Sequence, residues 1–173
     1  MTPLSPHSFP DEPDPDILAI LGQVPKRWGR MDILSRAAVV EIGRALVSPG
    51  SGEPAARVDA AARVGVIAGT RRGSLATDLA FARSLASGLE MASPTLFGYT
   101  LPNIALAEAA SHFGLTGPVY SVFAGPDDDP LQLARREAGR WLQSSTYTAM
   151  LAGALDYQPQ SPARLVAHFT WMS

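Results

Sequence analysis

The strongest constraint on the fold is the segment over residues 64–69, Val-Gly-Val-Ile-Ala-Gly, an apolar run that ends in glycine and precedes a helical pattern. A continuous apolar run of this length is typical of a strand that is buried on both faces. The helical pattern covers residues 74–86, and the same order returns as a strand over 119–124 and a helix over 130–142. Because parallel strands are joined by crossovers that usually contain a helix, this order predicts an α/β protein with a layered sheet.

Further elements complete this pattern. Residues 31–47 carry apolar side chains at helical spacing, with Asp32 in the first turn, where a carboxylate favours the helix dipole. Residues 55–62 are compatible with a loop or with a short helix. The chain is therefore expected to have about four strands and four helices, without an internal repeat. The remaining elements are a helix over 101–113 that ends at Gly114, and strands over 147–155 and 165–171.

The N-terminal segment has a different composition. Residues 1–16 contain five prolines and four acidic residues, and they offer few side chains for a core. Such a segment buries too little apolar surface to offset the entropy that ordering costs. We therefore expect a Pro-rich flexible tail over residues 1–25, with an apolar patch at 17–21 that is a candidate for docking. A single domain is expected over residues 26–173.

Composition excludes several classes of protein. The 173 residues include no cysteine, which removes disulfide frameworks, thiolate zinc sites and thiol catalysis. A formal net charge of −2 argues against a nucleic-acid-binding surface. The apolar runs are too short to span a bilayer, and the proline-rich start lacks the basic and apolar regions of a signal peptide. We expect a cytoplasmic protein with no membrane or nucleic-acid partner and no cofactor.

Two neighbouring motifs are more specific than these patterns. Residues 93–107 have the sequence Ser-Pro-Thr-Leu-Phe-Gly-Tyr-Thr-Leu-Pro-Asn-Ile-Ala-Leu-Ala, and residues 113–122 have Phe-Gly-Leu-Thr-Gly-Pro-Val-Tyr-Ser-Val. In order and spacing, they resemble the Ser-Pro-x-x-Phe segment, the Pro-Asn helix and the Gly-Leu-x-Gly-Pro turn of the β-ketoacyl synthases of fatty-acid and polyketide assembly. Further similarities to that family lie at residues 30–36, 64–73 and 150–153.

The resemblance, which covers roughly residues 26–156, implies a thiolase-like half-fold in which a mixed sheet is flanked by helices. Full-length members of the family add a second, similar half, and we expect this chain to end before that half begins. We also expect the family's opening strand to be absent, because the Pro-rich tail stands in its place.

The resemblance also locates the family's catalytic cysteine. Aligned on the Gly-Pro-x-Tyr-Ser-Val pattern, the family's Thr-Ala-Cys falls on Ala124, Gly125 and Pro126, and Asp127 follows. Proline has neither the sulfur nor the backbone N–H that can stabilise an oxyanion. The family's other catalytic groups, two histidines or a histidine and an asparagine, belong to its second half. We therefore expect no catalytic residue in this chain and no activity when it is alone.

Polar residues near this position have several candidate roles. Asp127 to Asp129 are typical of a helix cap, and we expect a cap rather than the alternative, a cation site with oxygen ligands. Residues 69–74 follow a strand and could cradle a phosphate, although they lack the Walker lysine. Arg71 and Arg72 are candidate contacts for an acidic acyl carrier protein, or else they are solvated. His112, near the end of a predicted helix, suits a structural role.

Three functional hypotheses remain. The favoured one is a non-catalytic β-ketoacyl-synthase-like accessory subunit, a pseudoenzyme that forms a homodimer or a heterodimer with a ketosynthase in fatty-acid or polyketide-type biosynthesis. The second is one half of a split β-ketoacyl synthase acyltransferase that another chain completes. The third is a decayed or stand-alone domain with an unrelated ligand. The first predicts an apolar surface that a second chain covers, with contributions from Leu96, Phe97, Tyr99, Leu101 and Phe123.

Overall fold

A mixed four-stranded sheet forms the centre of the fold. The computed structural model describes residues 4–5, 8–47, 63–86, 88–144, 146–160 and 162–173. The strand order is β2-β1-β3-β4, in which β1 is parallel to both of its neighbours and β4 is antiparallel to β3. The strands are β1 (Val64–Thr70), β2 (Val119–Phe123), β3 (Ala149–Gln158) and β4 (Arg164–Met172).

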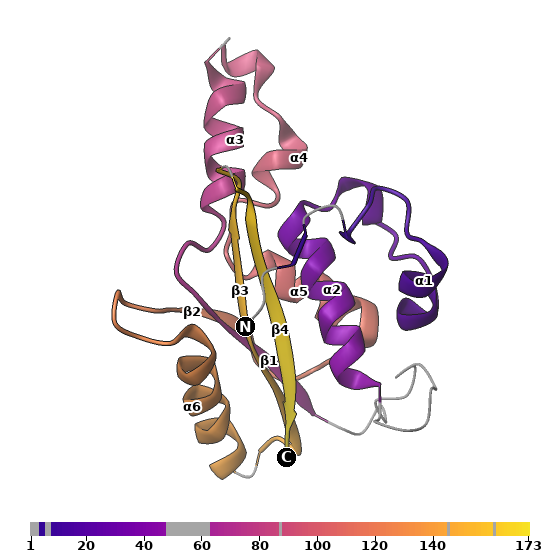
Figure 1. The fold of residues 1–173 in the computed structure, drawn as a ribbon, viewed down its shortest axis with the longest axis vertical. Coiled ribbons are helices and arrows are strands. Elements are labelled where there is room, and N and C mark those ends of the chain that lie inside the picture. Colours follow the sequence, from indigo (N-terminus) through magenta and orange to yellow (C-terminus); the bar gives the residue numbers. More distant parts are fainter. Residues whose placement is uncertain (1–3, 6–7, 48–62, 87, 145, 161) are drawn as a thin grey trace.

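Helices cover both faces of this sheet (Figure 1). Helices α2 (Ile33–Leu46) and α5 (Ile104–Phe113) lie on one face, and α6 (Pro130–Gln143) lies on the other. Successive residues of β1 therefore enter two different cores, Val66 on the side of α2 and α5, and Ile67 beneath α6. This arrangement confirms the predicted α/β class and the mixed sheet flanked by helices.

One carboxylate fixes the start of α2 and connects it to the next helix, α3 (Leu75–Leu85). Asp32 is the N-cap of α2, and its Oδ1 accepts a hydrogen bond from the N–H of Ser35 at 2.8 Å. Its Oδ2 accepts a second one from Oγ1 of Thr77 in α3, at 2.7 Å. Asp32, which was expected in the first turn of the helix, is thus the N-cap of α2 and also has a tertiary role. The segment 55–62 lies outside the described residues.

Helix α3 projects beyond the end of the sheet together with α4 (Pro94–Phe97) (Figure 1). The rings of Phe81 and Phe97 join the two helices, with their centroids 5.5 Å apart. Leu75 and Leu79 of α3 are nevertheless exposed. This projection, which we call the α3–α4 arm (residues 75–97), thus carries apolar side chains that the described residues do not cover.

Strand β2 differs from its prediction. Residues 119–124 were expected to form a buried strand, but β2 lies at the edge of the sheet and pairs only with β1 among the described residues. Its residues are at most half-buried, and the side chain of Phe123 is 60% exposed. An apolar run indicates that a strand avoids water, but it does not indicate whether the same chain supplies the cover.

Part of the segment expected to be a flexible tail packs on the rest of the chain, as the apolar patch at residues 17–21 suggested. Within it, helix α1 (Pro15–Leu21) packs on α2, and Ile17 and Leu21 are buried. Phe9 is buried as well, and its carbonyl accepts a hydrogen bond from the buried Arg36 side chain. Sparse apolar residues at the right positions thus suffice to dock a proline-rich segment. Whether residues 26–173 fold as a separate domain stays a prediction.

The outer edge of β4 makes a short contact with the N-terminal segment. Leu4 forms an isolated antiparallel bridge with Leu165 of β4, and its N–H donates to the Leu165 carbonyl at 2.8 Å. The contact lies on the outer edge of β4, because the other edge of β4 pairs with β3.

The helices in the described part of the chain are short. The longest two, α2 and α6, have 14 residues each. None of them combines the length and the apolar composition that are needed to cross a bilayer.

Candidate functional site

The turn between β2 and α6 carries Pro126, the residue that the motif resemblance aligns with the family's nucleophile. The N–H of Ala124 donates to the Thr70 carbonyl at 2.8 Å, which places the turn beside the end of β1. Within the turn, the N–H of Gly125 donates to Oδ2 of Asp128 at 3.0 Å. Asp129 is the N-cap of α6, and Pro130 is its first residue. Pro126 is therefore held on an ordered strand-to-helix turn.

The carbonyl oxygens of this turn face a cation. The guanidinium of Arg71 donates to the carbonyls of Gly125, Pro126 and Asp128, the Pro126 contact measuring 3.1 Å. An oxyanion hole has the opposite arrangement, because it directs N–H groups at a developing negative charge. Three backbone carbonyls around one guanidinium therefore stabilise a positive charge at this turn.

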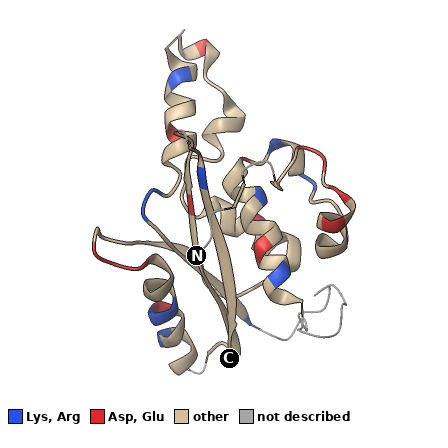
Figure 2. Cartoon of the chain, in the orientation of Figure 1, with Lys and Arg blue, Asp and Glu red and all other residues tan. Residues whose placement is uncertain are grey.

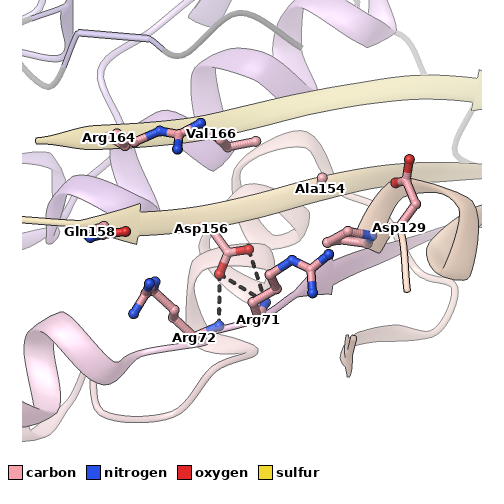
Figure 3. A pocket seen from close by; sticks show the side chains of 9 residues that line it. Arg71, Arg72, Asp129, Ala154, Asp156, Gln158, Arg164 and Val166 are labelled. Carbon is pink, nitrogen blue, oxygen red and sulfur yellow. Dashed lines mark hydrogen bonds between the residues drawn. The ribbon is translucent and has the colours of Figure 1, made fainter. Parts of the chain in front are cut away.

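A carboxylate on β3 fixes the backbone that carries Arg71 (Figure 3). Oδ1 and Oδ2 of Asp156 accept hydrogen bonds from the Arg71 N–H at 3.0 and 2.9 Å. The Arg72 N–H donates to Oδ1 of Asp156 at 2.9 Å, and Oγ1 of Thr70 donates to the same oxygen at 2.7 Å. From the sequence, residues 69–74 could cradle a phosphate. Two of the N–H groups that a phosphate would need are instead taken by the Asp156 carboxylate.

The close approach of β1 and α6 depends on Gly69. A Cβ added at this residue would lie 1.8 Å from the carbonyl oxygen of Pro130. No side chain fits in that space, since the obstruction is backbone. Glycine at this position therefore lets the first turn of α6 lie against β1 and brings Pro126 near Arg71.

Not all of the residues predicted to form a partner surface are exposed. The side chains of Phe97, Leu101 and Phe123 are 63%, 60% and 60% exposed, and Leu96 is half-buried. Tyr99 is buried, which corrects the prediction for this residue. The sequence analysis missed four further exposed apolar residues of the same region: Leu75, Leu79, Leu89 and Met91. For Leu75 and Leu79, a signal was available in their i, i+4 spacing on α3.

Tyr99 belongs to a buried polar cluster. Its hydroxyl donates to Oε1 of Glu108 at 3.1 Å, and Nε of Arg27 lies 3.2 Å from the same oxygen. Burial, together with the neighbouring Glu108 carboxylate, raises the pKa of Tyr99 to about 12. Tyr99 is therefore uncharged over the physiological pH range, and its hydrogen bond to Glu108 fixes residue 99 against helix α5.

The candidate polar residues outside the turn occupy structural positions. Nε2 of His112 lies 3.0 Å from the carbonyl oxygen of Leu21, and its ring contacts Phe113 edge-on. Asp129 accepts hydrogen bonds from the N–H groups of Leu131 and Gln132, as a helix cap does. Across the described residues, no three His, Cys, Asp or Glu side chains gather in a group that could hold a metal ion.

Comparison with known proteins identifies the family. The family model for the N-terminal domain of β-ketoacyl synthases matches residues 11–125. The chain belongs to the β-ketoacyl synthase family. This result confirms the resemblance found in the sequence motifs.

A solved structure agrees with this assignment and with the thiolase-like half-fold. The ishigamide ketosynthase/chain length factor has a TM-score of 0.63 to this chain, at 26% sequence identity. The similarity covers 82% of this chain and 38% of that one, so the chain spans less than half the length of this relative. No curated protein matches the chain.

Proposed function

We propose that this protein is a β-ketoacyl-synthase-like partner subunit that supplies no acyl-accepting nucleophile and acts beside a ketosynthase in polyketide-type or fatty-acid biosynthesis. The turn at residues 124–129 carries this proposal. The condensation chemistry of the family requires a thiolate on that turn, with N–H groups that stabilise negative charge. Here the position holds Pro126, and the 173 residues contain no cysteine.

The electrostatics of the turn support the same proposal. The guanidinium of Arg71 occupies the side to which the carbonyls of Gly125, Pro126 and Asp128 point. A thioester oxygen that displaced this guanidinium would meet carbonyl oxygens instead of donors, which disfavours a tetrahedral oxyanion. The turn is therefore suited to stability rather than to acyl transfer.

An open strand edge and an apolar surface support the association with a second chain. Among the described residues, strand β2 pairs with β1 on one side and has no partner on the other, and Phe123 at its end is exposed. Phe97 and Leu101 contribute exposed apolar side chains from the region of the α3–α4 arm. A second chain that pairs with β2 would satisfy its free N–H and C=O groups and cover these side chains.

The solved relative supports a ketosynthase as the partner. That relative is the ishigamide ketosynthase/chain length factor, a name that joins a ketosynthase to a chain length factor. We propose a heterodimer with a ketosynthase, and a homodimer through the same surface when no ketosynthase is present. Of the two arginines predicted to contact an acyl carrier protein, we retain Arg72 alone. The guanidinium of Arg71 is occupied by the turn carbonyls.

A split enzyme is the second candidate. The similarity covers 38% of the solved relative, and this candidate assigns the remainder to another chain. That chain would also have to supply the nucleophile, because Pro126 stands at its position. Acyl transfer by the reconstituted pair, absent from the mate alone, would favour this candidate.

Loss of association in a surface variant tests the proposal. We expect Phe97→Ser combined with Phe123→Ser to weaken dimerisation, or binding to a ketosynthase, at least about tenfold, because buried aromatic side chains dominate interface energies. Val24→Ser is the matched control, since Val24 is exposed but lies in the loop after α1. Sedimentation velocity with and without ketosynthase provides the measurement. A wild-type chain that stays monomeric and binds no ketosynthase would contradict the proposal.

A further inference from the structure

We propose that a cavity of about 310 Å³ beside the turn binds a small organic anion, with a phosphate or carboxylate head and a short apolar body. Such a volume is at the lower end of those found for small-molecule sites. The cavity lies next to the Arg71 turn, but it is a separate space and involves no acyl transfer. Its lining residues are Arg71, Arg72, Asp129, Pro130, Ala154, Asp156, Gln158, Arg164 and Val166.

The cavity exists because α6 covers only part of its face of the sheet. On β3, Met150 and Ala152 are buried in the core beneath α6, and the alternate residues Ala154, Asp156 and Gln158 continue the same face. Helix α6 begins at Pro130, which lies against Gly69, and Gly69 pairs in register with Ala154. In the described part of the chain, α6 therefore does not extend over the sheet face beyond Ala154.

Cross-strand pairing extends this open face onto β4. Gln158 is paired with Arg164, and Asp156 with Val166. Paired residues of antiparallel strands place their side chains on the same face. Arg164 and Val166 thus border the cavity next to the β3 residues, and Arg72 approaches from the turn after β1 (Figure 3).

The carboxylates of the lining accept hydrogen bonds from groups other than the arginine side chains. Asp156 accepts from two backbone N–H groups and from the Thr70 hydroxyl. Asp129 accepts from the N–H groups of Leu131 and Gln132. Neither carboxylate forms an ion pair with an arginine of the lining among the described residues. Both acids are therefore poor competitors for the cationic side chains of the cavity.

Two arginines are left to bind an anion. The Arg71 guanidinium donates to the turn carbonyls, but no hydrogen bond or ion pair occupies the guanidinium of Arg72 or Arg164 within the described residues. A phosphate or carboxylate is the group that two guanidinium forks recognise best. The N-terminus of the 14-residue helix α6 also borders the cavity, and its dipole favours negative charge there.

The remaining lining defines the rest of the ligand. Pro130, Ala154 and Val166 provide an apolar wall, and the amide of Gln158 offers both a donor and an acceptor. A bare inorganic anion would leave that wall exposed to water. An anion with a short alkyl or aryl group uses both parts of the cavity.

Titration of the free chain with four small probes tests this inference without any ketosynthase, so that its failure is distinct from failure of the proposed function. The probes are butyl phosphate, butyrate, inorganic phosphate and 1-butanol, at fixed ionic strength. We expect saturable 1:1 binding of butyl phosphate, butyrate or both, with NMR shifts confined to residues 70–73 and 154–166. Inorganic phosphate should bind at least about fivefold more weakly than butyl phosphate, and 1-butanol should not bind.

Variants connect the binding to the two arginines. We expect Arg72→Gln and Arg164→Gln each to weaken binding at least about tenfold, since each removes one charged fork. Arg136→Gln, on the exposed side of α6, is the matched control and should change binding less than twofold. All three positions are at the surface, and circular dichroism verifies the fold of each variant.

Several outcomes would overturn the inference. The first is the absence of binding by both organic anions at about 10 mM. The second is an equal loss of binding in the control and the cavity variants. The third is equal binding of inorganic phosphate and butyl phosphate. Binding of an acidic carrier protein that depends on Arg72 and Arg164, without binding of either organic anion, would also overturn it.

Discussion

Gly69 lies at the closest approach of strand β1 and helix α6, and its replacement by alanine gives the sharpest test of the packing around the turn. A Cβ at this position would lie 1.8 Å from the Pro130 carbonyl oxygen and 2.4 Å from the carbonyl carbon. Both atoms belong to the backbone, so no rotamer change relieves the contact. To reach ordinary van der Waals distance, the first turn of α6 must retreat by about 1.6 Å.

The expected cost follows from this movement. Overpacking of a well-packed core typically costs about 1–3 kcal/mol, and a backbone obstruction belongs at the upper end. The reduced entropy of the unfolded chain offsets about 0.5 kcal/mol of that cost. We therefore expect Gly69→Ala to lower the free energy of unfolding by about 2.5 kcal/mol. For a chain of this size, the corresponding decrease in Tm is roughly 5–10 °C.

Urea and thermal denaturation, followed by circular dichroism, measure this change. Gly139→Ala is the matched control on α6, because a Cβ there meets no atom within 4 Å. Alanine is also the better helix former, so this control should gain about 0.5–1 kcal/mol. A Gly69→Ala variant as stable as the wild type would refute the close packing of α6 on β1, and with it the geometry derived for the turn.

Two further variants test the contacts around the site. Arg71→Met should speed hydrogen exchange of the amides in residues 124–129 at least about tenfold, because the turn carbonyls lose their shared donor, whereas Arg83→Met on α3 should leave that exchange unchanged. Because the pKa of Tyr99 rises from 10.0 to about 12 on folding, its contribution to stability is complete below pH 10 and is lost as the pH rises toward 12. Tyr99→Phe should therefore remove part of the decline in urea midpoint between pH 9.5 and about 11.5, and identical declines in both proteins would contradict the assignment.

Local patterns were sufficient for most of the secondary structure. The apolar runs, the glycines and the helical periodicity of 64–69, 74–86 and 130–142 predicted β1, α3 and α6 close to their observed bounds. The sequence motifs also predicted the family, because the order of the Ser-Pro, Pro-Asn and Gly-Pro segments is preserved. Residue type and spacing at short range carry this information.

Long-range contacts could not be predicted in this way. Nothing near Arg71 in the sequence indicates that its guanidinium meets the Gly125 carbonyl, 54 residues away. The buried position of Tyr99 depends on Glu108 and Arg27, which come from separate elements. The edge position of β2 depends on strand order, which the apolar pattern does not encode. The cavity beside α6 follows from the same strand order and from the residue at which the helix begins.

The most direct test of the proposed function is an acyl-loading assay read by intact mass. The purified chain is incubated with acyl-carrier and acyl-CoA thioesters, alone and in complex with a ketosynthase. Because the motif alignment puts Pro126 at the position of the family's nucleophile, we predict no covalent acyl adduct on this chain in either case, together with altered loading or product length of the ketosynthase in the complex. A stoichiometric acyl adduct on this chain would show that another residue acts as the nucleophile, and it would contradict the central claim.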